Sequence, residues 1–172
     1  DYRGGPVTPA LYRDWLRAMG VRYVLLPHDE LDPAARAEAR LLEQGVPGLT
    51  LVRSSSPKLA IYELSDATPI LTPPPGAPDD ATARTRILRM TGDSISLYAP
   101  VAGVYSLRVT YTQYWRVDDP TAACVERGPG NMSQLRVAKP GPVQLNFSLS
   151  FEGAVTGGRA PVCASPSALP PS

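Results

Sequence analysis

The two thiols of this chain are the residues most able to do covalent chemistry. Cys124 and Cys163 are the only cysteines among the 172 residues, and neither has the short spacing to other cysteines or histidines that a zinc site requires. An isolated pair of this kind predicts one disulfide bond, whose closure contributes about 3–4 kcal/mol to stability. Because disulfides persist outside the cytosol, the pair predicts an exported domain.

Side chains that commonly act as catalytic acids or bases are few and scattered. His28 is the only histidine, and it stands beside Asp29 and Glu30 after a strand-like run. It could serve there as a general base or a metal ligand, but a lone histidine without a second metal ligand nearby is typical of a solvated loop. Adjacent acids at 79–80 and 118–119 favour turns and helix caps over an opposed catalytic pair. We therefore predict no catalytic residue, no metal and no cofactor.

The most aromatic stretch is YTQYWR, residues 111–116. Aromatic rings can stack on sugars, so this stretch opens a carbohydrate-binding interpretation. In a strand, however, alternate side chains point to opposite faces, which puts Tyr111 and Trp115 on the apolar face and predicts that they pack in the core. Tyr114 and Arg116 point to the other side, and we take them as the candidate ligand-binding residues.

Composition narrows the classes of partner. The 17 basic and 16 acidic residues are interspersed and leave a net charge of +1. Nucleic-acid binders concentrate Lys and Arg on one face, so no nucleic-acid partner is expected. No run reaches the ~18 apolar residues of a membrane span, and no signal peptide opens the chain. An exported domain without its own signal is expected to be part of a longer polypeptide.

The first lobe, residues 1–71, carries two helix signals. Thr8-Pro9 and Asp32-Pro33 are N-cap and first-turn pairs, and Gly20 and Gly45 are the expected ends. On the first helix one apolar stripe is expected: Leu11, Tyr12, Trp15, Leu16 and Met19. Strands are expected at 21–26, 49–53 and 59–64. The order helix, strand, helix, strand, strand predicts a small α/β lobe whose first two strands can lie parallel.

A Pro-rich linker, TPPPGAPDD at 72–80, is expected to be extended and semi-rigid. Residues 81–164 then lack a helical pattern, and strands are expected at 87–90, 94–98, 104–117, 135–137 and 143–151. Two of these strands alternate apolar and polar residues, which is typical of sheets with one buried face. We therefore predict an α+β protein whose second lobe is an antiparallel β-sandwich-like domain, followed by a disordered tail at 165–172.

Three phrases carry a resemblance to a known family. They are YRDWLRAMGVRYVLLPHDELD, LTLVRSSSPKLAIYEL and YWRVDDPTAACVERG. They resemble segments that follow the last membrane helices of large polytopic bacterial membrane proteins, especially actinobacterial ones. Those proteins are similar to the glycosyltransferase-C superfamily, which uses lipid-linked sugar donors. The resemblance covers most of residues 9–151.

The resemblance implies a location more than an activity. In such proteins the chemistry is assigned to acidic residues in loops between membrane helices, and those loops are not part of this sequence. It implies a non-catalytic extracytoplasmic domain at the bacterial plasma membrane, linked to cell-envelope glycan assembly. The expected partners are the membrane portion of the same polypeptide and cell-envelope glycan. A stand-alone carbohydrate-binding β-sandwich module remains the alternative.

Overall fold

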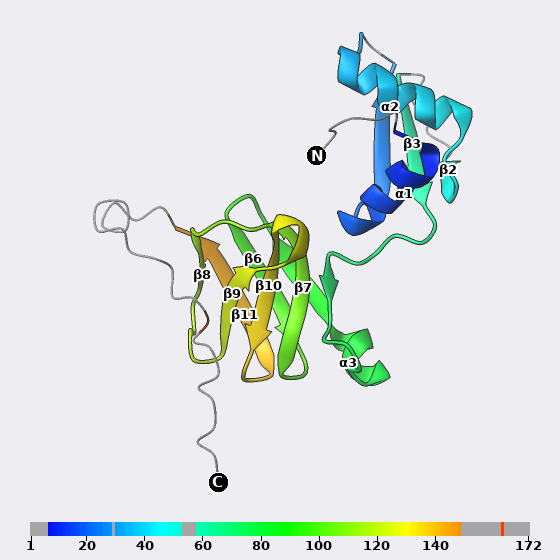
Figure 1. Cartoon of the computed structure of the whole chain (residues 1–172). Coiled ribbons are helices and arrows are strands. Elements are labelled where there is room, and N and C mark those ends of the chain that lie inside the picture. The colour runs from blue at the N-terminus through cyan, green and yellow to red at the C-terminus, as the bar shows by residue number, and fades with distance from the viewer. Residues whose placement is uncertain (1–6, 29, 53–57, 149–162, 164–172) are drawn as a thin grey trace. The chain divides into compact units, whose positions relative to one another are not determined.

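The computed structural model describes residues 7–28, 30–52, 58–148 and 163. The chain divides into two compact units, Asp1–Ile70 (unit 1) and Leu71–Ser172 (unit 2). The described residues form three α-helices and three sheets, and every strand pair is antiparallel. The protein is therefore a mixed α+β protein with a sheet-rich body (Figure 1).

Unit 1 has the predicted order of elements: α1 (Pro9–Ala18), β1 (Tyr23–Pro27), α2 (Pro33–Gln44), β2 (Leu49–Val52) and β3 (Leu59–Leu64). Both predicted N-caps are present, because Thr8 accepts a hydrogen bond from the Leu11 backbone and Asp32 accepts one from the Ala35 backbone. Just past α2, Gly45 has φ of +91°, a conformation that glycine adopts without a side-chain penalty.

The sheet of unit 1 has the order β1-β3-β2. Both outer strands run antiparallel to β3, so β1 and β2 point the same way without being hydrogen-bonded neighbours. The first two strands therefore do lie parallel, as expected, but β3 lies between them. The reason is that β3 follows β2 after a short connection, pairs with it as an antiparallel neighbour, and offers its other edge to β1.

The core of unit 1 lies between the two helices and one face of this sheet (Figure 1). Tyr12 and Leu16 of α1 are each 2% exposed. The rest of the predicted stripe differs, since Leu11 is 61% and Trp15 is 43% exposed. The buried stripe of α1 is therefore narrower than expected and consists of Tyr12 and Leu16.

Unit 2 contains two four-stranded sheets. The first has the order β4-β7-β10-β9, built from β4 (Leu71–Thr72), β7 (Gly103–Thr110), β10 (Met132–Val137) and β9 (Ala123–Arg127). The second has the order β5-β6-β11-β8, built from β5 (Arg86–Met90), β6 (Ser94–Ala99), β11 (Gly141–Phe147) and β8 (Trp115–Val117). A six-residue helix, α3 (Asp79–Arg84), precedes β5.

Several sequence-based expectations for unit 2 differ from the structure, including the expected lack of helix after residue 80, since α3 extends to Arg84. The 72–80 segment carries Thr72 in β4 and the first residues of α3, so it is not extended throughout. The strand expected at 104–117 is two strands, β7 and β8, which belong to different sheets. Strand β9 was not expected. The end of the strand expected at 143–151, and the tail at 165–172, lie outside the described residues.

One hydrophobic cluster of unit 2 takes side chains from both sheets. Ile95, Leu97 and Leu145 of the second sheet are fully buried, and so are Leu107 and Leu135 of the first sheet. All occupy inward positions of the two-residue alternation. The polar residues between them are thereby left on the outward faces of the sheets, where a binding site can form.

Candidate functional site

Cys124 of β9 and Cys163 form a disulfide with a Cα–Cα distance of 5.5 Å, which lies within the usual range for such bonds. Cys163 is 6% exposed. The sequence predicted this pair. Because the two cysteines are 39 residues apart, the bond ties the C-terminal part of the chain to an edge strand of the first sheet of unit 2.

Trp115 is a core residue, as alternation predicted. It is 6% exposed, belongs to the hydrophobic cluster of unit 2, and meets Phe147 edge-on with ring centroids 5.9 Å apart. Among the described residues, its buried Nε1 has no hydrogen-bond partner. Tyr111 is only half-buried, and its ring lies 5.2 Å from the guanidinium carbon of Arg127. Neither ring forms an open platform for a sugar.

The two predicted ligand-binding residues stand at one end of the second sheet of unit 2. Tyr114 is 37% exposed, and its ring packs edge-on against Phe147 at 5.6 Å. Arg116 pairs in register with Asn146, but its guanidinium donates to the carbonyls of Gln113 and Trp115 at 2.5 and 3.0 Å. Arg116 therefore stabilises the turn before β8 as well as lying on the outward face.

Sequence reasoning did not find the polar residues beside this pair. Four outward side chains, which we call the polar ladder, run across the sheet: Ser96, Gln144, Asn146 and Asp118. Ser96 Oγ donates to Gln144 Oε1, Gln144 Nε2 donates to Asn146 Oδ1 at 3.0 Å, and Asn146 Nδ2 donates to Asp118 Oδ1 at 2.6 Å. These three hydrogen bonds run in one direction, toward the carboxylate, so they polarise one another. Only the alternation of β11 in the sequence hinted at this face.

A pocket of about 310 Å³ opens beside the polar ladder. We call it the ladder groove. Its polar side chains come from Ser96, Gln144, Asp118 and Asp119, and apolar walls include Leu88 and Pro142. Leu88 is 53% exposed because a register irregularity in β5 lies between Ile87 and Arg89. A second pocket of about 300 Å³ lies near the disulfide and is lined by Arg116 and Cys124, among others.

Asp118 and Asp119 begin the turn that sequence analysis expected. Asp119 Oδ1 accepts from the Thr121 hydroxyl at 2.7 Å and from its backbone at 2.9 Å. These hydrogen bonds, with the charge of Lys139, hold the pKa of Asp119 below its ordinary value although burial opposes them. Asp119 is therefore a carboxylate at neutral pH, and its hydrogen bonds are those of a turn residue.

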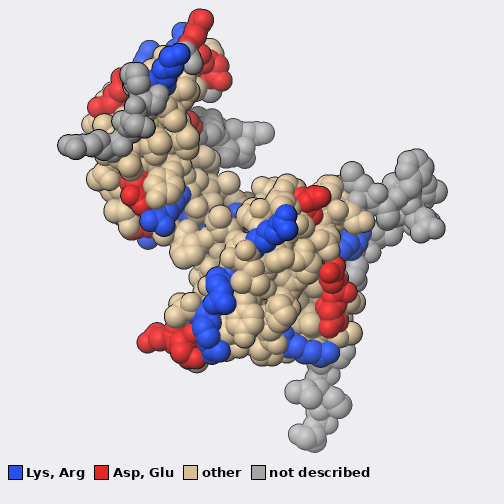
Figure 2. All heavy atoms as spheres, turned by 180° about the vertical axis from the view of Figure 1, so that it is seen from behind, with Lys and Arg blue, Asp and Glu red and all other residues tan. Residues whose placement is uncertain are grey.

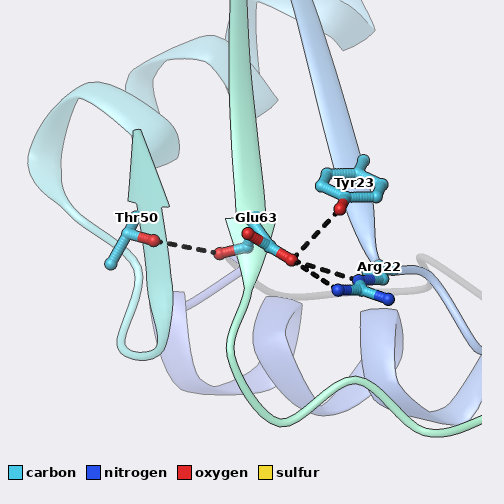
Figure 3. Close-up of polar contacts among 4 residues, drawn as sticks. All are labelled: Arg22, Tyr23, Thr50 and Glu63. Carbon is cyan, nitrogen blue, oxygen red and sulfur yellow. Dashed lines mark hydrogen bonds and ion pairs between the residues drawn. The ribbon is translucent and has the colours of Figure 1, made fainter. Parts of the chain in front are cut away.

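Unit 1 carries a separate polar cluster on the sheet face opposite its helices (Figure 3). Glu63 of β3 accepts from Arg22 at 2.9 Å and from the Tyr23 hydroxyl at 3.1 Å. The hydrogen bond to Glu63 raises the pKa of Arg22. Nearby, the Thr50 hydroxyl donates to the Glu63 backbone carbonyl at 3.5 Å. These hydrogen bonds, which all reach Oε1 of Glu63, join β3 to β1, so this cluster stabilises the sheet.

The other candidate residues from the sequence do not form a common site in the described part of the chain. The backbone of His28 donates to the Lys58 carbonyl at 2.8 Å, which places it at the end of the β1–β3 pairing. Within the described ranges, no three His, Cys, Asp or Glu side chains could hold a metal ion, although Asp29 lies outside those ranges. Basic residues stand in separate spots with acidic residues among them in Figure 2. No helix of the described part is long and apolar enough to cross a membrane.

No protein-family model, curated protein or solved structure matches this chain.

Proposed function

We propose that this chain is a non-catalytic, extracytoplasmic part of a multi-pass bacterial membrane protein of glycosyltransferase-like type, and that it contacts cell-envelope glycan. The observation that carries the location is the Cys124–Cys163 disulfide, because such bonds persist in oxidising compartments. The resemblance of the three sequence phrases supports the membrane-protein context. A sandwich arrangement of the two sheets of unit 2, with outward faces open to ligand, is part of the proposal.

The test uses the full polypeptide in the cells that carry it. An antibody against this chain should find it in the membrane fraction after carbonate washing, and protease added to intact spheroplasts should remove it. Without reduction, the denatured chain should react with no thiol reagent. A chain found in the cytosolic fraction, with both thiols reactive, would contradict the proposal.

A stand-alone carbohydrate-binding module is the second candidate function. The observation that favours it is the polar ladder, which lies in register beside Arg116 on an outward sheet face. The sequence before Asp1 separates the two candidates. Several apolar segments of about 20 residues would support the membrane protein, whereas a cleaved signal peptide would support the stand-alone module.

A further inference from the structure

The ladder groove is rich in hydrogen-bond acceptors. The Ser96 hydroxyl uses its one donor on Gln144, and the Gln144 amide uses both of its donors, on Asn146 and on the Leu145 carbonyl. Aspartates have no donor when ionised. The four polar side chains that line the groove therefore have no side-chain donor left over, while their oxygens retain acceptor capacity.

The two carboxylates determine which kind of ligand this surplus of acceptors can bind. Asp118 Oδ1 is occupied by Asn146, and Asp119 Oδ1 is occupied by Thr121. Within the described part of the chain, no residue donates a hydrogen bond to the Oδ2 atom of Asp118, whereas the Ala122 backbone also acts on the Asp119 carboxylate. A ligand that fills the groove must therefore bring donors. A phosphate or uronate would bring only acceptors and a charge of the same sign as the aspartates.

The groove also has apolar surface. Leu88 and Pro142 line it together with the polar side chains. A sugar ring has hydroxyl donors at its edge and C–H groups on its faces, so it can satisfy the carboxylates and still cover the apolar walls. A compact cation fits less well, because Lys139 already lies near Asp119 and donates to Thr121 at 2.9 Å.

We propose that the ladder groove binds a sugar residue of a neutral, polyhydroxylated glycan, with Asp118 accepting its hydroxyl groups and Leu88 packing on its ring. This inference rests on the glycan contact in the proposed function and adds the class of glycan and its position. Arg116, in register with Asn146, lies farther along the same sheet, where the following sugar of a chain would lie, and Tyr114 packs on Phe147 at that end.

The experiment titrates the complete chain with three neutral oligosaccharides, mannohexaose, cellohexaose and isomaltohexaose. Hexagalacturonate serves as the anionic probe and chitosan hexamer as the cationic one. Binding is measured by calorimetry and by the shift of the Gln144 side-chain amide signals in NMR spectra. We expect at least one neutral probe to bind, with an affinity that changes little between low and physiological salt, since the interaction carries no net charge on the ligand.

Two pairs of variants locate the site. Asp118→Asn keeps the side-chain shape but removes the charged acceptor, and we expect a loss in affinity of about tenfold or more. Leu88→Ser removes an apolar wall and should weaken binding severalfold. Asp80→Asn and Leu51→Ser make the same kinds of change at exposed positions outside the groove, and should leave affinity unchanged. Thermal melts confirm that each variant is folded.

The outcomes separate the inference from the proposed function. Binding only of the anionic or cationic probe would overturn the neutral class while leaving glycan contact intact. Binding of a neutral probe that Asp118→Asn and Leu88→Ser both leave unchanged would overturn the position. Failure of every glycan to bind would overturn the inference together with the glycan contact, whereas the location of the chain is decided by the spheroplast experiment.

Discussion

At the scale of the residue, substitutions of Trp115 test whether its ring belongs to the core or to a sugar-binding surface. We expect Trp115→Ala to lower the free energy of unfolding by about 3–5 kcal/mol, because a buried indole leaves a large cavity. Trp115→Phe should cost less, since it keeps a ring against Phe147 and removes an N–H that has no partner among the described residues. Urea denaturation measures both. A fully stable Trp115→Ala that lost only glycan binding would contradict the core assignment.

The sequence correctly predicted the roles of several residues in the fold. The cysteine pair and the caps Thr8 and Asp32 depend on composition or on neighbours within three residues, so local reasoning reaches them. The hydrogen bonds of Arg116 depend on a turn at 113–114 that no strong turn residue marks, and the polar ladder joins residues up to 48 positions apart. Contacts of that kind arise from sheet register, which the alternation of one strand does not specify.

At the scale of the element, Asp66 holds α1 to the segment after β3. It accepts a hydrogen bond from Arg13, and Arg17 lies 3.4 Å from the same carboxylate. Gly48, with φ of +80°, lies close to Arg13. A Cβ added at residue 48 would be only 3.3 Å from Arg13 Nε. Burial alone would raise the pKa of Asp66, but the hydrogen bond and the two positive charges lower it below its ordinary value.

This lowered pKa gives a pH-dependent contribution to stability. A carboxyl whose pKa is lower in the folded state stabilises the fold above its unfolded pKa, and that contribution is lost as the pH falls through the folded pKa. We expect the difference in melting temperature between the wild type and Asp66→Asn to be largest at neutral pH and to shrink below about pH 4. Asp14→Asn, on the exposed side of α1, is the control. A difference that stays constant with pH would contradict the ion pair.

The split between β7 and β8 shows a limit of pattern reasoning. Tyr105, Leu107, Trp115 and Val117 all stand at odd positions, and all contribute to or pack against one cluster. Alternation reports whether a side chain points inward, and it continues unchanged when the chain crosses to the other sheet around the same core. The sequence therefore predicted the buried face correctly and the number of strands wrongly. Strand β9 was missed because it offers only two buried positions, Ala123 and Val125.

At the scale of the whole molecule, the two units have separate hydrophobic clusters. One is built from residues of unit 1, and the other from buried residues between Leu71 and Leu145 of unit 2. The cysteines both belong to unit 2. Unit 2 has about 100 residues, the commonest size of an independent domain, so the residues needed for its core are contained within one continuous segment.

We therefore expect a truncated chain, 71–172, to fold alone when it is made in an oxidising compartment, with one cooperative thermal transition and the near-ultraviolet circular dichroism of packed aromatic rings.

The position at which the truncated chain begins is a second part of the prediction. Leu71 of β4 is 5% exposed and pairs with Leu107 of β7, so a chain beginning at residue 73 loses a buried leucine and an edge strand. It should be less stable by about 2–5 kcal/mol. Equal stability of the two truncated chains would show that β4 does not stabilise unit 2. A 71–172 chain without a cooperative transition would show that unit 2 requires residues of unit 1.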